Sequence, residues 1–185
     1  MNSIIIKLIE RLLLKDLKKE INQKHLICKE QIGFMEGLGC EVNLLRLRQR
    51  CNDIKNVNKG FVKAVIFIDL KNAYDTVDHG ILFNKLEKMN IRPRLIRVLK
   101  ALYSSARISV DINDSSINVN RGVLQGSILS PFLFNLYIND LIEKIKKVAF
   151  EILAYADDIA ILCSCEKEIN LEIDVVDGQK KTNLF

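Results

Sequence analysis

Residues 150–163 have the sequence FEILAYADDIAILC, in which two apolar runs flank a short acidic interruption. The runs 150–155 and 159–163 are typical of β-strands, because branched and aromatic side chains are enriched in strands and acidic ones are depleted. Residues 156–158 separate them, and a short polar interruption of this kind favours a turn. The stretch therefore predicts a β-hairpin with Asp157 and Asp158 at its tip.

Another acidic residue stands at the end of an earlier apolar run. Residues 61–70 are rich in branched side chains and include Asp69 near their end, so they predict a buried strand that ends in a carboxylate. Each acidic residue alone has an ordinary explanation, Asp157 and Asp158 as turn residues and Asp69 as a strand terminus. Presented together on one sheet, they are a suitable holder for Mg²⁺, which prefers hard oxygen ligands. Two such ions about 4 Å apart support phosphoryl transfer.

The other patterns predict helices and one further hairpin. Apolar residues recur at helical spacing, Asp78 is a suitable N-cap, and Pro93 suits the first turn of a helix. The predicted helices are 5–21, 42–51, 79–89, 93–103 and 130–147, and the further hairpin joins 107–112 to 117–120. This mixture of helices and hairpins predicts an α+β fold.

Composition narrows the class of protein. Of the 185 residues, 49% are hydrophobic and 28% are charged, which is typical of a soluble folded protein. No stretch reaches the roughly 18 uninterrupted apolar residues of a membrane span, and the N-terminal apolar run lacks the cleavage site of a secretory signal. The five cysteines have neither the count nor the spacing of a disulfide framework or a zinc site. We therefore expect an intracellular protein with no membrane partner.

The formal net charge of +5 is unevenly distributed along the chain. Residues 1–147 carry 25 basic and 15 acidic side chains, whereas residues 148–185 carry 3 and 8. A basic body with a local acidic concentration suits a polyanionic partner beside a cation site. Solvated helix faces would give the same totals, so charge alone leaves both interpretations open.

Three segments resemble the palm motifs of reverse transcriptases, in the order that the family has them. Residues 67–79 (FIDLKNAYDTVDH) resemble the first motif, 121–135 (RGVLQGSILSPFLFN) the second and 154–158 (AYADD) the third. Residues 31–34 (QIGF) are similar to a fingers segment of non-LTR retrotransposon enzymes. Overall the motifs look most like non-LTR retrotransposon polymerases, and group II intron maturases are the nearest alternative. The resemblance covers about residues 20–165.

The resemblance implies a metal site built from the carboxylates. Asp69 and Asp157 would ligate two Mg²⁺ ions, for which Mn²⁺ is a possible substitute. The backbone carbonyl of Leu70 would lie nearby, and Asp158 would be a secondary or structural carboxylate. We therefore expect Asp69, Asp157 and Asp158 as the catalytic residues, and these three with Leu70 as the metal site.

The resemblance also implies a nucleotide site, made with Leu70 by three further residues. Tyr74 would lie beneath the nucleotide sugar and exclude a 2′-hydroxyl sterically. Gln125 and Gly126 would contact the incoming base pair, where a small residue allows close backbone approach. Leu124 departs from the proline that the family often has before Gln125, which puts the shape of this loop in doubt.

The fold implied by the resemblance is a polymerase palm, an antiparallel sheet with packed helices, next to a partial and mainly helical fingers region. We expect the fingers-like region at 1–60, the palm with its three motifs at 61–165 and an irregular truncated tail at 166–185. We expect the family's thumb and an upstream fingers segment to have no counterpart in the chain. The chain is therefore expected to be a fingers–palm fragment of a longer polyprotein.

The function implied is an RNA-directed DNA polymerase, which uses deoxynucleoside triphosphates as substrates and adds deoxynucleoside monophosphates to the 3′-hydroxyl of a DNA primer on an RNA template. A nuclear location is expected if the element is eukaryotic. One alternative is a catalytically silent palm remnant that only binds nucleic acid. Another is an RNA-dependent RNA polymerase, against which Tyr74 argues because its ring would exclude ribonucleotides.

Overall fold

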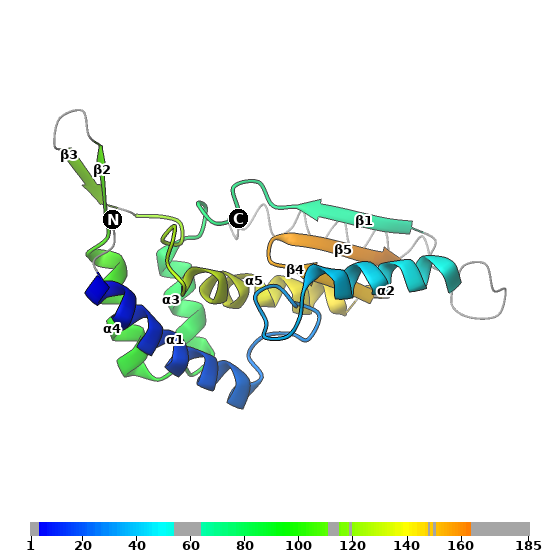
Figure 1. The fold of residues 1–185 in the computed structure, drawn as a ribbon, viewed down its shortest axis with the longest axis horizontal. Coiled ribbons are helices and arrows are strands. Elements are labelled where there is room, and N and C mark those ends of the chain that lie inside the picture. Colours follow the sequence, from blue (N-terminus) through cyan, green and yellow to red (C-terminus); the bar gives the residue numbers. More distant parts are fainter. Residues whose placement is uncertain are drawn as a thin grey trace. The chain divides into compact units, whose positions relative to one another are not determined.

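The computed structural model describes residues 4–53, 64–110, 115–118, 120–147, 149 and 151–163 (Figure 1). In chain order the elements are α1 (Ile4–Lys24), α2 (Cys40–Asp53), β1 (Ala64–Asp69), α3 (His79–Lys88), α4 (Pro93–Ser104), β2 (Arg107–Val110), β3 (Ser115–Asn118), α5 (Ser130–Lys146), β4 (Glu151–Tyr155) and β5 (Asp158–Cys163). The expected α+β class is confirmed. Across these ranges, no helix combines the length and apolar character that crossing a membrane requires.

The predicted helices and hairpins are present, with two differences at the turns. Asp158 is the first residue of β5 and not part of the preceding turn, because it is paired with Asp69 in the sheet ladder. Residues 115–116 likewise belong to β3 and not to the turn before it. In both cases polar residues, which are typical of turns, are paired in a strand instead. The strand residues expected at 61–63, 111–112, 119 and 150 and the irregular tail expected at 166–185 lie outside the described residues.

The chain divides into two compact units, each formed by two separate segments. The helical unit contains Met1–Leu26 and Tyr74–Tyr137, and the sheet unit contains Ile27–Ala73 and Ile138–Phe185. α5 therefore contributes its first half to the helical unit and its second half to the sheet unit. The division expected at residues 60 and 165 stays a prediction.

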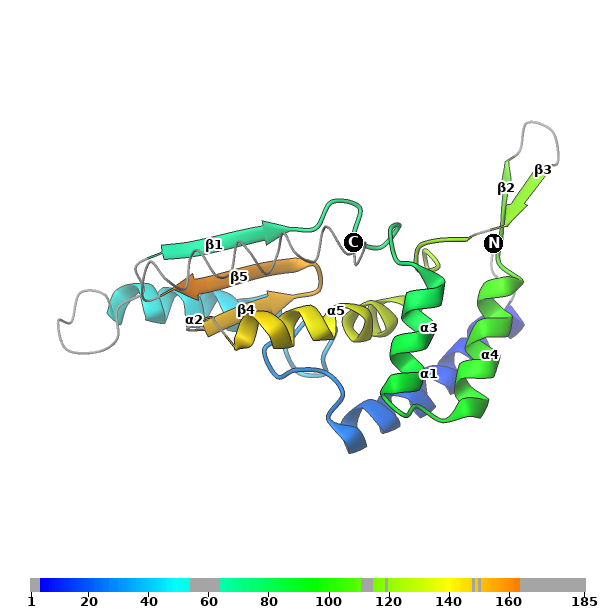
Figure 2. The same cartoon turned by 180° about the vertical axis from the view of Figure 1, so that it is seen from behind.

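The sheet unit contains an antiparallel sheet in the order β1-β5-β4 (Figures 1 and 2). β5 is the central strand, and its register with β1 runs from Ala64 opposite Cys163 to Asp69 opposite Asp158. On β5, Leu162 has no exposed surface. The continuous apolar run in this strand is explained by its central position, with both faces largely covered.

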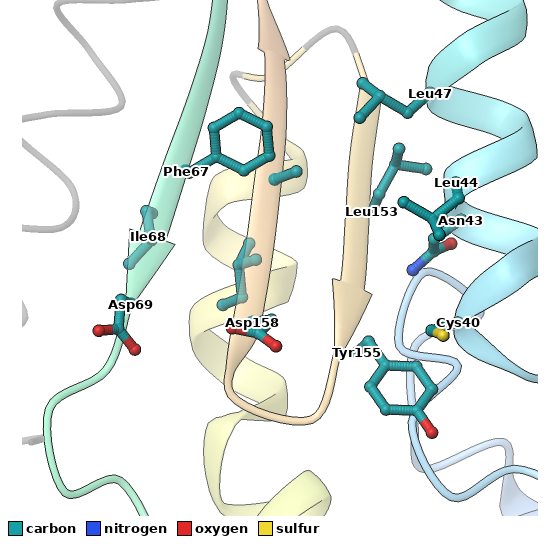
Figure 3. Close-up of a pocket in the computed structure, with 12 residues that line it drawn as sticks. Cys40, Asn43, Leu44, Leu47, Phe67, Ile68, Asp69, Leu153, Tyr155 and Asp158 are labelled. Atoms are coloured by element: carbon teal, nitrogen blue, oxygen red, sulfur yellow. The ribbon is translucent and has the colours of Figure 1, made fainter.

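α2 packs beside β4 and covers part of one sheet face (Figure 3). Leu47 of α2 packs against a buried cluster formed by Leu153 and Leu162. The cover is incomplete, because Phe67 of β1 is 72% exposed. This open part of the sheet adjoins the strand ends that carry the acidic residues.

In the helical unit, α1 and α3 both pack against α4. The contact is apolar, since Leu17 of α1, Leu82 of α3 and Leu99 of α4 have no exposed surface. The expected N-cap of α3 is confirmed, because the Asp78 side chain accepts the N–H of the third helical residue at 2.9 Å. Pro93 occupies the first turn of α4, as expected.

A buried carboxylate joins α1 to the start of α4. The Glu20 side chain is only 5% exposed; it accepts hydrogen bonds from Lys24 Nζ at 3.0 Å and the Arg92 backbone N–H at 3.1 Å, and pairs with Arg92 Nε. Burial alone would raise the pKa of Glu20, but the hydrogen bonds from Arg92 and Lys24 outweigh it and hold that pKa below its ordinary value.

We expect Glu20→Gln to lower the free energy of unfolding by about 2 kcal/mol at pH 7, because a neutral amide replaces a buried charged acceptor. The folded-state pKa is lowered, so the charged form stabilises the chain above the ordinary carboxyl pKa, and this contribution is lost as pH falls through the folded pKa. Urea unfolding should therefore show the two proteins converging in acid. Asp16→Asn, which removes an exposed partner of Arg92 at 3.5 Å, is the matched control and should change little. Equal stability of Glu20→Gln and wild type at pH 7 would contradict the prediction.

Candidate active site

The acidic residues predicted at two strand termini meet at one end of the sheet. Asp69 is the last residue of β1, Asp158 is the first of β5, and the two are directly opposite in the antiparallel register. Opposed residues project from the same face of a sheet, and Figure 3 shows both carboxylates at the same end of the strands. Asp157, in the turn immediately before, is half-buried, whereas Asp69 and Asp158 are exposed.

These three carboxylates have no compensating partner among the described residues, since none of those donates a hydrogen bond to them or forms an ion pair with them. Like charges directly opposite each other on a strand pair repel, so a cation would relieve the site. Within the same ranges, no three His, Cys, Asp or Glu side chains form a ready-made metal cluster. The donor set still fits Mg²⁺, which proteins usually bind through one or two carboxylates together with waters or substrate phosphates.

Leu70 follows Asp69 directly and lies at the start of a turn. Its side chain is buried, and its carbonyl oxygen accepts a hydrogen bond from the Ala73 N–H at 3.1 Å. A carbonyl has two lone pairs, so this contact leaves acceptor capacity for a further partner. The role of Leu70 beside a metal stays a prediction.

A cavity of about 440 Å³ opens beside the carboxylates, between α2 and the sheet face that carries them (Figure 3). Its walls are mainly apolar, and they include Leu44 of α2, Phe67 of β1 and Tyr155 of β4. Asp69 and Asp158 lie at one end of it. Such a surface suits a ligand that combines apolar rings with anionic groups, the latter held through a cation.

In the helical unit, the segments around Tyr74 and Gln125 run side by side. The Val123 N–H donates to the Tyr74 carbonyl at 2.8 Å, and Gln125 Nε2 donates to Asp75 Oδ1 at 3.1 Å. Gly122 has φ +84°, and a Cβ there would lie 3.0 Å from the Asp75 Cα. Only glycine combines this conformation with so close an approach. The structure thus brings the first and second motifs together through their backbones.

The predicted nucleotide-binding residues of this unit differ in exposure. The ring of Tyr74 is half-buried and stacks on Phe134, with the centroids 4.5 Å apart and the planes at 22°. Gln125 is exposed, and Gly126 has φ +79° with no atom within 4 Å of the position that a Cβ would take. Tyr74 is therefore held firmly, whereas the loop at Gln125 and Gly126 presents an open surface.

Residues of α3 and α5 contact the loop that contains Gly122 and Leu124. His79 Nε2 lies 2.7 Å from the Gly122 carbonyl oxygen, and the His79 ring meets the Tyr103 ring edge-on at 4.9 Å. Burial raises the pKa of Tyr103 to about 12, so its hydroxyl keeps its proton at neutral pH. Ser130 Oγ donates to the Leu124 carbonyl at 2.6 Å. Leu124, which replaces a common proline, is thus held by a hydrogen bond to α5.

The predicted site residues fall into both units. Asp69, Leu70, Asp157 and Asp158 belong to the sheet unit, and Tyr74, Gln125 and Gly126 to the helical unit. Only three residues separate Leu70 from Tyr74 along the chain, so one short connection links the two sets. Their catalytic and binding roles stay predictions.

Comparison with known proteins identifies the family. Residues 1–183 match the family model described as reverse transcriptase (RNA-dependent DNA polymerase). The chain is 32% identical over 168 residues to the probable RNA-directed DNA polymerase from transposon BS of Drosophila melanogaster, covering 85% of this chain and 18% of that protein. It is 26% identical to a retrovirus-related Pol polyprotein from the type-1 retrotransposable element R2 of Popillia japonica, covering 83% and 23%. The chain thus spans about a fifth of the length of these relatives.

A solved structure shares the fold. Apo telomerase from Candida tropicalis, truncated from its C-terminal domain, aligns with a TM-score of 0.68 at 15% identity, covering 94% of this chain and 37% of that one. At this identity the likeness bears on the fold alone, and it confirms the expected palm-type α+β architecture. The family match extends over nearly the whole chain and includes all three predicted motifs. The chain belongs to the reverse transcriptase family, and its curated relatives include the non-LTR retrotransposon polymerases that its motifs resemble.

Proposed function

We propose that the chain provides the fingers and palm of an RNA-directed DNA polymerase of non-LTR retrotransposon type, which extends a DNA primer on an RNA template. One observation carries the proposal. In a chain of this family, Asp69 and Asp158 are opposed in register at the end of the sheet, with Asp157 beside them and no described residue to neutralise them. Carboxylates so placed are a binding site for hard cations.

In this proposal Asp69 and Asp157 hold two Mg²⁺ ions, or Mn²⁺ in their place, with Asp158 and the Leu70 carbonyl beside them. When bound, the ions supply activation of the primer hydroxyl and neutralisation of phosphate charge. The chain's own contribution is positioning. The β1–β5 ladder fixes Asp69 relative to Asp158, so the negative charge is in place before any substrate arrives.

The helical unit would select the incoming deoxynucleoside triphosphate. The Tyr74 ring, held by Phe134, would lie beneath the sugar and clash with a 2′-hydroxyl. Gln125 and Gly126 would face the new base pair, where the open space at Gly126 admits a base or backbone closely. Discrimination between deoxynucleotides and ribonucleotides would then be steric.

Primer extension tests the proposal directly. Purified chain at micromolar concentration is mixed with an RNA template, an annealed DNA primer, Mg²⁺ and one deoxynucleotide at a time. We expect addition of the template-matched nucleotide that stops when EDTA is added. Filter binding of the same duplex should weaken steeply with salt, because the excess of basic residues in 1–147 releases counterions on binding.

The alternatives predict different outcomes in the same assay. We expect slow single-nucleotide addition at best from the isolated chain, because the thumb and an upstream fingers segment that position the primer are expected to be missing. Duplex binding without any nucleotide addition, in a chain extended by those flanking segments as well, would contradict the proposal and indicate a silent palm that only binds nucleic acid. Equal use of ribonucleotides and deoxynucleotides would indicate an RNA polymerase and would contradict the role of Tyr74.

A further inference from the structure

The turn that carries Asp157 has an unusual backbone conformation. It consists of Ala156 and Asp157, between Tyr155 of β4 and Asp158 of β5, which are paired with each other. Ala156 has φ +55°. A residue with a Cβ rarely adopts this left-handed conformation, and it persists only where surrounding contacts enforce it.

Besides the hairpin pairing, one buried side chain supplies such contacts. Gln31 is 1% exposed, and its Nε2 donates to the Ala156 carbonyl oxygen at 2.8 Å. Its Oε1 accepts the Ala156 N–H at 2.8 Å and the Gly33 N–H at 3.0 Å. One amide group therefore satisfies both backbone polar groups of Ala156, which is itself buried. Removing it would leave buried donors and acceptors unpaired.

The backbone around Gln31 is fastened to the same strand. The Ile32 N–H donates to the Ala154 carbonyl at 3.0 Å, and the Ala154 N–H donates to the Glu30 carbonyl at 3.1 Å. Gln31 thus forms a parallel bridge with Ala154 at the edge of β4. Because both sides of this contact are anchored, the Gln31 amide reaches the turn from a fixed position.

Gly33 lets the chain pass close against the turn. A Cβ at this position would lie 2.3 Å from the Ala156 nitrogen, far inside van der Waals contact. The same Cβ would lie 2.9 Å from Gln31 Oε1 and 3.1 Å from the Ala156 Cα, so it would press on the backbone of the turn and on the amide that binds it. The turn is therefore held by hydrogen bonds from Gln31 and confined sterically at Gly33.

We infer that Gln31 is a positioning residue for Asp157: by holding Ala156 in its left-handed conformation, it sets the direction in which the next side chain leaves the turn. The inference rests on the proposed function, in which Asp157 binds a divalent cation. Without the Gln31 amide, only the pairing of Tyr155 with Asp158 holds Ala156 at positive φ, so the peptide that joins Ala156 to Asp157 is less firmly fixed. Cation affinity would then fall although Asp157 is unchanged.

The test uses the full 185-residue chain, with Mn²⁺ as the probe. Bound Mn²⁺ broadens nearby amide resonances, so a titration followed by NMR reports cation affinity at Asp69, Asp157 and Asp158 without any need for catalysis. Gln31→Met removes the hydrogen bonds at similar volume, and Gly33→Ala displaces the turn by contact alone. We expect each to weaken Mn²⁺ affinity by about 10-fold or more. Gln49→Met, an exposed residue of α2, is the matched control and should leave affinity unchanged.

Gln31→Glu provides a second variant, which keeps an acceptor oxygen, loses the donor to the Ala156 carbonyl and adds a negative charge. Its added negative charge would by itself attract cations, so weaker binding in this variant must come from the displaced turn. We expect weaker Mn²⁺ binding and faster amide hydrogen exchange at Ala156, while the amide spectrum of the rest of the chain shows a retained fold. Gln49→Glu is its control.

The possible failures are distinguishable. If Mn²⁺ does not broaden the Asp157 and Asp158 amides in the wild-type chain, the proposed function is contradicted. If wild-type broadening is seen and Gln31→Glu binds as tightly or more tightly while Ala156 exchanges faster, the positioning role of Gln31 is overturned and the proposed function stands.

Discussion

Asp157→Asn is expected to reduce single-nucleotide addition by about 10³-fold or more, and Asp69→Asn by a similar factor. An amide is a neutral and much weaker ligand for Mg²⁺ than a carboxylate, so the variant loses the cation or holds it wrongly. The measurement is the rate of template-directed addition at saturating primer–template, compared at several Mg²⁺ concentrations. Both variants should remain inactive as Mg²⁺ is raised.

The fold should survive these substitutions. Asp69 and Asp158 repel each other across the β1–β5 ladder, so neutralising Asp69 removes an unfavourable interaction, and thermal unfolding should be unchanged or slightly higher in temperature. Asp16→Asn makes the same chemical change at an exposed position on α1 and should retain full activity. If both active-site variants keep more than a few per cent of wild-type activity, the metal assignment is wrong.

Tyr74→Ala is expected to raise the use of ribonucleotides relative to deoxynucleotides by about 10–100-fold. The Tyr74 backbone is anchored by the hydrogen bond from the Val123 N–H, and its ring stacks on Phe134, so moving the ring aside for a 2′-hydroxyl would break this stacking. Removing the ring would open space for the 2′-hydroxyl of a ribonucleotide. The relevant quantity is the ratio of kcat/KM for the two nucleotides, because discrimination is expressed in the transition state.

Tyr74→Phe keeps the ring and loses only the hydroxyl, so it serves as the control and should discriminate like wild type. A ratio that stays the same in Tyr74→Ala would mean that Tyr74 is a structural aromatic residue packed on Phe134. Loss of all nucleotide addition in Tyr74→Ala, together with a lower unfolding temperature, would lead to the same conclusion.

The sequence predicted those features that depend on local patterns. The apolar runs around Asp69 and Asp157 predicted their strands, because branched and aromatic residues are enriched in strands. Asp78 and Pro93 predicted helix starts through their own backbone chemistry. Family resemblance then predicted which carboxylates gather, and the register of β1 with β5 brings Asp69 and Asp158 together.

The sequence could not predict features that depend on contacts between distant segments. Strand register places Asp158 in the ladder and not in the turn, and no property of Asp158 itself indicates this. Gln31 is a polar residue that sequence patterns would place on the surface, yet its partner Ala156 lies 125 residues away. A buried glutamine needs a complete set of hydrogen bonds, and only the folded chain provides them. The motif at Gln31–Phe34 was the one local sign of its importance.

The order of strands in the sheet has a consequence for synthesis on the ribosome. β5 is central and pairs with both β1 and β4, yet it is the last of the three in the chain. β1 therefore emerges about 90 residues before its only described strand partner, a delay of roughly 5–20 s at ordinary translation rates. During that interval the backbone N–H and C=O groups of β1 have no strand to pair with, and Phe67 is exposed. Chaperones bind nascent chains in this condition. Synthesis that ends between residues 104 and 158 gives a chain whose helical segments 4–24 and 79–104 are complete but whose sheet cannot form.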